Sequence, residues 1–246
     1  MRKYFVTADA IQSNKVVDYF NLSKGNLRTV LASEEITQIR GLPVNTGWLK
    51  EASKIYNISD DLKDYVIVCV KIFFSDLPNR NGVAFPKSEL IKFNPDLGCC
   101  GYETWRRKPT FLEHNNSIKE NAKGVIFDST LRPARGFRGD LVSVDLLAGY
   151  DRTKDPNLVK SILDGSRNCY SMGSYAEDFK CSVCGKLLSK GPCEHFSLTN
   201  PKFECFDGKV GFANTIGVEG FELSNVETPA FLPATTSGHD FVSVPK

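Results

Sequence analysis

Histidine is scarce in this chain: three occur among 246 residues, at positions 114, 195 and 239. Because imidazole is the usual general base near neutral pH and a common metal ligand, sites of either kind must be few. Long apolar runs are also lacking, since no stretch approaches the roughly 18 residues of a membrane-spanning helix. Arg2-Lys3 near the start is not followed by the apolar segment of a signal peptide. We therefore expect an intracellular protein with no membrane partner.

An excess of charge of either sign is absent as well. The chain has 31 basic and 29 acidic residues, which gives a formal net charge of +2. This balance argues against a nucleic-acid partner held mainly by charge. An apolar fraction of 41% is enough for a hydrophobic core, and the length suits one domain with an extension.

Composition divides the chain into three parts. We expect an N-terminal extension over residues 1–60, with helical patterns at 14–22 and 27–39. A main domain should occupy residues 61–234. Residues 235–246 are rich in Thr, Ser, Gly and Pro and predict a flexible tail.

The main domain is predicted to be α+β and mostly β. Runs rich in β-branched and aromatic residues predict strands at 65–74, 109–114, 124–129 and 140–147, a strand containing Ser171, and two strands within 210–231 broken by Gly217 and Gly220. One helix is well marked at 155–165, because it has aspartate at the N-cap, proline at the first position and a terminal glycine.

Three of the eight cysteines cluster in one short segment, which favours metal binding over a disulfide scaffold. Cys181 and Cys184 form a C-x-x-C pair, and Cys193 and His195 follow closely. Three thiolates and an imidazole match a four-coordinate structural zinc site, which leaves no open position for catalysis. We predict a zinc-binding clip over about 179–197, and Cys205 is a lower-ranked alternative ligand.

The zinc assignment affects the search for a catalytic base. If His195 binds metal and His239 lies in the tail, His114 is the main candidate base. Ser171 stands before Met-Gly on a predicted strand, and serine needs a nearby imidazole to become a nucleophile at neutral pH. His114 and Ser171 are therefore candidates for base and nucleophile.

An ordered set of motifs resembles the prohead (capsid maturation) proteases of tailed phages, which are relatives of the herpesvirus assembly protease. The resemblance spans about residues 64–234. Its motifs are, in order, Pro78-Asn79-Arg80-Asn81-Gly82, Leu112-Glu113-His114-Asn115, Gly124-Val125-Ile126, Tyr170-Ser171-Met172-Gly173 and the closing strand Glu222-Leu223-Ser224-Asn225-Val226-Glu227-Thr228-Pro229-Ala230. The cysteine cluster is similar to a zinc-binding insertion of some large-phage members.

The resemblance implies a β-barrel flanked by helices that carries a serine-protease site. Ser171 would be the nucleophile, His114 the general base, and Glu222 the group that orients the imidazole. Alternatives for the third role are Glu177, Asp178, or His195 in the absence of zinc. The family uses backbone amides and sometimes arginine for the oxyanion hole, and the candidate arginines here are Arg132, Arg135 and Arg138, for which surface contact is the competing role.

The function implied is a serine endopeptidase that cleaves scaffold and capsid precursor proteins, and itself, during phage prohead maturation. It would act in the host cytoplasm inside the assembling prohead, as a homo-oligomer without nucleic acid. Two alternatives stay open: a non-enzymatic zinc-containing binding module, and an inactive structural capsid or scaffold protein.

Overall fold

A computed structural model describes residues 4–5, 36–39, 42–134, 140–234 and 241–243 of the chain. The strands are β1 (Tyr4–Phe5), β2 (Ile36–Ile39), β3 (Leu42–Asn45), β4 (Tyr65–Phe74), β5 (Val83–Ala84), β6 (Phe93–Asn94), β7 (Cys99–Cys100), β8 (Pro109–Leu112), β9 (Gly124–Pro133), β10 (Val142–Asp151), β11 (Cys169–Ala176), β12 (Asp178–Cys181), β13 (Cys205–Phe206), β14 (Lys209–Val210), β15 (Ala213–Ile216), β16 (Glu219–Val226) and β17 (Phe241–Ser243). The α-helices are α2 (Leu49–Tyr56), α3 (Lys87–Ile91) and α4 (Pro156–Leu163), with 3-10 helices at η1 (Leu62–Asp64), η2 (Gly101–Trp105), η3 (Lys119–Asn121) and η4 (Leu188–Lys190). The predicted class, α+β and mostly β, is confirmed.

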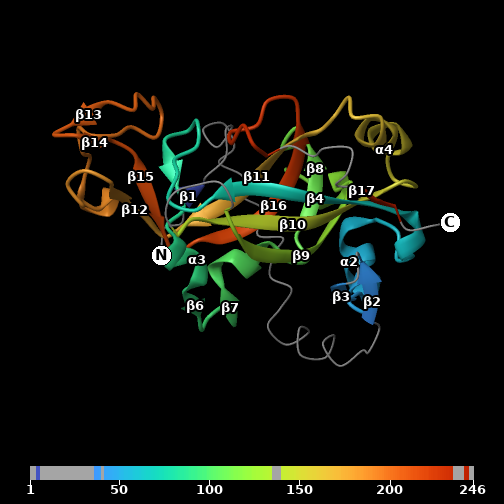
Figure 1. Cartoon of the computed structure of the whole chain (residues 1–246). Coiled ribbons are helices and arrows are strands. Elements are labelled where there is room, and N and C mark those ends of the chain that lie inside the picture. The colour runs from blue at the N-terminus through green and yellow to red at the C-terminus, as the bar shows by residue number, and fades with distance from the viewer. Residues whose placement is uncertain (1–3, 6–35, 40–41, 135–139, 235–240, 244–246) are drawn as a thin grey trace.

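One curled sheet dominates the molecule (Figure 1). Its strand order is β1-β11-β16-β8-β9-β10-β4-β17. Neighbouring strands are antiparallel except β16 and β8, which run parallel. Because the sheet curls into a half-barrel, β11 and β4 approach each other without being hydrogen-bonded neighbours.

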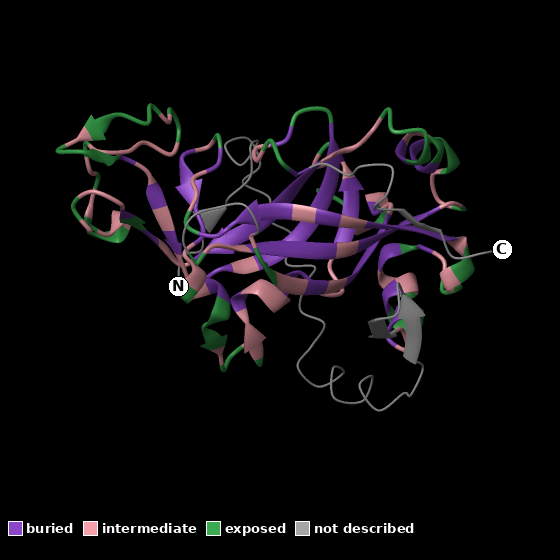
Figure 2. Ribbon diagram, in the orientation of Figure 1, coloured by how far each residue is buried: buried purple, intermediate pink, exposed green. Residues whose placement is uncertain are grey.

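Strand β4 is buried on both faces, which explains its nearly continuous apolar sequence. Val66, Val68 and Val70 point into the large core between the arms of the curled sheet. Tyr65 and Ile67, on the opposite face by the two-residue period of a strand, lie in a second core with the buried residues of α2. Figure 2 shows this burial along the central strands.

The packed body begins earlier than residue 61. Trp48 and Tyr56, at the two ends of the α2 segment, are almost fully buried in the second core, so α2 is part of the fold although it falls within the expected extension. The helix predicted at 27–39 is wrong at its end, because residues 36–39 form β2 and pair with β3. Residues 14–22 and 27–35 lie outside the described part. At the other end, residues 241–243 of the expected flexible tail form β17 and pair with β4.

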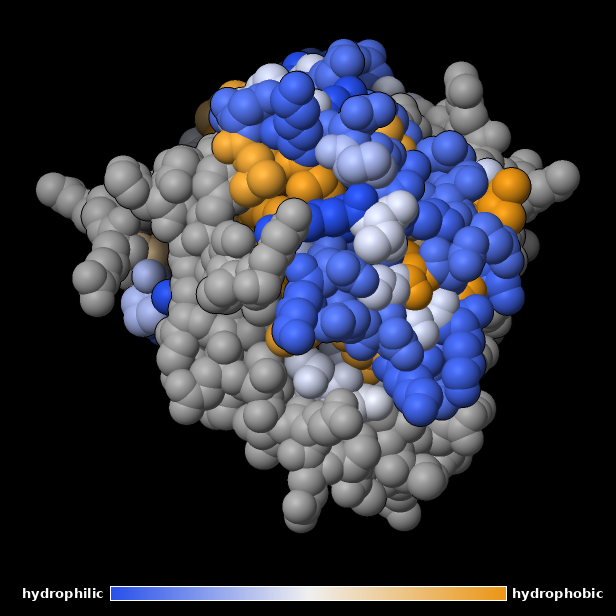
Figure 3. Space-filling view, turned by 90° about the vertical axis from the view of Figure 1, so that its right-hand side faces the viewer, coloured by the Kyte–Doolittle hydropathy of each residue, from blue (hydrophilic) through white to orange (hydrophobic). Residues whose placement is uncertain are grey.

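A small lobe projects from one end of the sheet (Figure 1). It contains the hairpin β13–β14 and is joined to the body by the three-stranded sheet β12-β15-β5. At the opposite end, beside α4, the described residues form a mainly hydrophilic surface with separate hydrophobic areas (Figure 3). In the described part of the chain no helix is both long and apolar enough to cross a membrane.

Candidate active site and metal centre

His114 lies two residues after β8, in a turn with an uncommon backbone, so the strand predicted over 109–114 ends early, at Leu112. Glu113 and His114 have φ angles of 50° and 53°, the left-handed region that non-glycine residues seldom adopt. The turn is held by several bonds: the Glu113 amide donates to the Asn225 carbonyl at 3.0 Å, and the Glu113 carboxylate accepts from Arg167 at 3.0 Å and from the amide of Glu227 at 3.1 Å. This turn directs the imidazole back toward β16.

A buried carboxylate on β16 meets that imidazole. Glu222 Oε1 lies 2.8 Å from His114 Nδ1, and the glutamate side chain is completely buried. The second oxygen, Oε2, accepts a hydrogen bond of 2.6 Å from the Ser224 hydroxyl. The same hydroxyl accepts from the backbone amide of His114 at 3.2 Å. Ser224 thus connects the carboxylate to the backbone of the histidine, and both oxygens of Glu222 have partners.

Ser171 lies on the neighbouring strand, directly opposite Ser224 in the β11–β16 register. Side chains of directly opposed residues leave the same face of a sheet, with Cβ atoms about 5 Å apart. Ser171 and Ser224 therefore share the face on which Glu222 and His114 meet. The Ser171 hydroxyl makes no hydrogen bond to a residue that the structure describes, and nucleophile–base bonds are often long before substrate binds.

Gly173 provides the space for the carboxylate. It is paired with Glu222 across the two strands, and a Cβ atom at this position would lie 2.7 Å from Glu222 Oε1 and 2.5 Å from the ring of Phe221. Real Cβ atoms do not approach other atoms so closely. The glycine of the Ser-Met-Gly motif is thus explained by the positions of Phe221 and Glu222.

Two buried tyrosines lie in the core next to this site. The rings of Tyr150 and Tyr170 are 6.2 Å apart. Burial raises the pKa of Tyr150 well above its usual value, and the nearby Tyr170 and Glu222 raise it further. The surroundings of Glu222 therefore include a phenol that stays neutral.

A pocket opens beside Ser171. Apolar walls come from Phe73, Met172 and Phe231, and Asn79 and Asn81 add side-chain amides. Two backbone hydrogen bonds hold the segment 230–234 against the rest of the pocket. The Arg80 amide donates to the Ala230 carbonyl and the Tyr170 amide donates to the Ala234 carbonyl, each at 2.9 Å. A chemical group that enters this pocket would lie next to Ser171.

The other predicted candidates for the third catalytic role lie elsewhere. Glu177 packs against Gly217, and Asp178 accepts hydrogen bonds from Ser189. Arg132 of β9, a candidate for the oxyanion hole, pairs with Asp145 at 3.3 Å and is not among the residues that line the pocket. Arg135, Arg138 and His239 lie outside the described residues.

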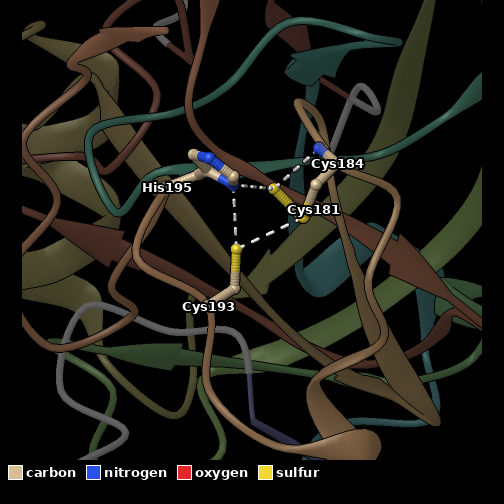
Figure 4. Close-up of side chains that lie close together, drawn as sticks. All are labelled: Cys181, Cys184, Cys193 and His195. Carbon is tan, nitrogen blue, oxygen red and sulfur yellow. Dashed lines mark hydrogen bonds between the residues drawn. The ribbon is translucent and has the colours of Figure 1, made fainter.

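The predicted metal ligands form one cluster. Ligand atoms of Cys181, Cys184, Cys193 and His195 all lie within 4.8 Å of one another. Figure 4 shows the four side chains directed at a common centre. Cys193 Sγ is 3.1 Å from His195 Nδ1 and 3.5 Å from Cys184 Sγ. Cys205 is exposed on β13 and is not part of the cluster.

The C-x-x-C turn is shaped to present thiolates. The amides of Val183 and Cys184 point at Cys181 Sγ at 3.3 and 3.5 Å. A backbone hydrogen bond from Lys186 lowers the pKa of Cys184 to about 6, whereas burial raises the pKa of Cys193. Three thiols this close cannot all ionise without a cation between them, because their charges repel. The donor set is positioned to bind a metal ion and is compatible with zinc.

No family model, curated protein or solved structure matches this chain.

Proposed function

We propose that this chain is a serine endopeptidase with Ser171 as nucleophile, His114 as general base and Glu222 as the residue that orients the imidazole. The observation that carries the proposal is the bond between His114 Nδ1 and the fully buried Glu222, on the face of the sheet from which Ser171 projects. This arrangement has the chemical roles of a serine-protease triad.

The roles follow from the contacts. With Glu222 accepting at Nδ1, that nitrogen carries the proton and Nε2 is the basic atom. Nε2 takes the Ser171 hydroxyl proton as Oγ bonds to the scissile carbonyl carbon. His114 returns the proton to the leaving amine as the C–N bond breaks. Water then hydrolyses the acyl-enzyme by the same proton transfers, and Glu222 stabilises the transient imidazolium.

The biological setting is part of the same proposal. The motif order found in the sequence supports a herpesvirus-protease-like barrel and a role in phage prohead maturation, with capsid and scaffold precursors as substrates, self-cleavage and homo-oligomerisation. The protein would act inside the assembling prohead. Zinc bound by Cys181, Cys184, Cys193 and His195 would brace the projecting lobe, because a Cys3His site leaves no coordination position for substrate.

The test uses the full-length chain and three variants. Ser171→Ala and His114→Ala remove the nucleophile and the base, and Ser174→Ala removes another buried serine of β11 as a matched control. Each is co-expressed with a capsid precursor, and intact masses are measured. Trimming should occur in the parent and in the Ser174→Ala variant alone. Equal trimming in all four proteins would overturn the assignment, and no trimming in any would favour a structural role.

A further inference from the structure

The turn at residues 78–82 borders the same pocket as Ser171, and the triad gives it no role. Asn79 begins this turn, because its carbonyl accepts from the Gly82 amide at 2.9 Å, and it is buried, with 7% of its surface exposed. Its side-chain oxygen Oδ1 accepts from the amides of Asn81 at 3.0 Å and Val83 at 3.2 Å. Because both donors are backbone amides, only the oxygen end of the side chain can face them. The orientation of the Asn79 amide is therefore set by the turn.

The opposite end of this side chain is a donor with no assigned partner. Asn79 Nδ2 makes no hydrogen bond to the residues that the structure describes. A side-chain NH2 group has two donor hydrogens, and these stay available to a group that enters the pocket. Asn79 lines the pocket together with Ser171, so a ligand there would provide an acceptor.

We propose that Asn79 Nδ2 is an oxyanion-hole donor for the reaction at Ser171, an inference that rests on the proposed function. When Oγ attacks, the carbonyl π electrons move onto oxygen, which becomes negative and accepts from Nδ2. When the C–N bond breaks and His114 protonates the amine, the carbonyl re-forms and the hydrogen bond weakens. Asn79 is neutral and transfers no proton, so it stabilises the intermediate without entering the proton balance.

Preorganisation distinguishes Asn79 from its neighbour Asn81. Asn81 also lines the pocket, but it is only partly buried and its side chain has no hydrogen bond to a described residue. The Asn79 turn is held further by the main chain, since Ala213 donates to the Gly82 carbonyl at 2.8 Å and Val83 pairs with Ala213 of β15. A donor fixed before the reaction stabilises a developing charge more than one that must be ordered during it.

The decisive variants are Asn79→Asp and Asn79→Ser, with Asn81→Asp as the matched control. Aspartate and serine both keep an oxygen that can accept from the turn amides, but neither carries the NH2 group. Asn81→Asp adds the same negative charge to the same pocket. The readout is the rate at which an alkyl fluorophosphonate labels Ser171 in each purified full-length protein, with Ser171→Ala as the blank. Thermal melting monitors folding.

We expect both Asn79 variants to label about 10²–10³-fold more slowly than the parent, the usual effect of removing one oxyanion donor. Asn81→Asp adds the charge without removing the preorganised donor, so it should slow labelling at least about tenfold less than Asn79→Asp does. Labelling of the parent with unchanged rates at Asn79 would overturn this inference and leave the proposed function standing. Equal slowing of labelling by Asn79→Asp and Asn81→Asp, with Asn79→Ser labelling at the parental rate, would show that the added negative charge causes the loss. That result would also overturn the inference about Asn79. Failure of the parent itself to label would sink the proposed function and the inference together.

Discussion

Glu222→Gln is the substitution that tests the proposed triad most directly. Glutamine has the size of glutamate and can still accept from the Ser224 hydroxyl through its carbonyl oxygen. Its NH2 group would then face His114 Nδ1, where the carboxylate now accepts. Nδ1 would have to become the acceptor, which moves the imidazole proton to Nε2. In that tautomer Nε2 cannot take the proton of Ser171.

The loss of catalytic rate in Glu222→Gln can be estimated from the geometry. The carboxylate lies 2.8 Å from Nδ1 and is completely buried, so the charge centres of Glu222 and an imidazolium at His114 are close together. At about 4 Å and an effective dielectric constant of about 20, the attraction is about 4 kcal/mol. That is roughly a thousandfold in rate. The wrong tautomer adds to this loss, so we expect a fall of about 10³–10⁴-fold in kcat.

The assay is cleavage of a fluorescence-quenched peptide that the parent cuts, with single-turnover acylation measured separately. Glu227→Gln serves as the control, because Glu227 directly follows β16 but has an exposed side chain, paired with Arg167 at 3.5 Å. The control should retain parental kcat. A fall of less than about tenfold in Glu222→Gln, with folding intact, would refute the electrostatic reasoning.

Three further predictions concern other parts of the molecule. Gly173→Ala should destabilise the fold by about 1–3 kcal/mol and abolish cleavage, because its Cβ would displace the Glu222 carboxylate; chemical denaturation and the peptide assay check both effects. Cys184→Ser should reduce bound zinc from about one per chain toward none and lower the melting temperature, as measured by elemental analysis and calorimetry; unchanged zinc would contradict the site. Burial raises the pKa of Tyr56 and Tyr65 above the usual value of 10.0, so neutral tyrosine is favoured in the folded state, and stability should be complete below pH 10 and fall as pH rises further. In an absorbance titration at alkaline pH, these phenols should ionise only as the circular dichroism signal of folding is lost, whereas their ionisation in the folded protein would contradict the prediction.

Local patterns in the sequence predicted the strands and the best-marked helix well. Residues 65–74 form β4, and Asp155 caps α4 by accepting from the Leu158 amide at 2.9 Å. Such features depend on residues that are neighbours in the chain, so local sequence patterns predict them. The strand pair within 210–231 was only partly right: the break is at Gly217, whereas Gly220 lies inside β16. The wrong helix end at 36–39 has a similar origin, since the sequence there does not reveal the pairing of β2 with β3.

The sequence named residues that the structure brings together, but it did not predict their geometry. Register decides that Ser171 faces Ser224 and that Glu222 faces Gly173, and a shift of one residue would turn these side chains to the other face of the sheet. The hydrogen bonds of Ser224 and Asn79 were not predicted, because they join distant segments or cross a folded turn. A serine two residues after a predicted catalytic glutamate on one strand was the available signal, since residues at this spacing share a face.

The energetic cost of the arrangement at His114 favours a catalytic role for it over a purely structural one. Glu222 is a carboxylate without exposed surface, and a buried charge of this kind seldom stabilises a fold more than an apolar side chain of similar volume. Glu113 and His114 adopt left-handed backbone angles in succession, each at a cost on the order of 1 kcal/mol. A fold selected for stability alone would favour neither feature. Both are explained if the imidazole must be held by a buried carboxylate beside Ser171, and this is the arrangement that a general base requires.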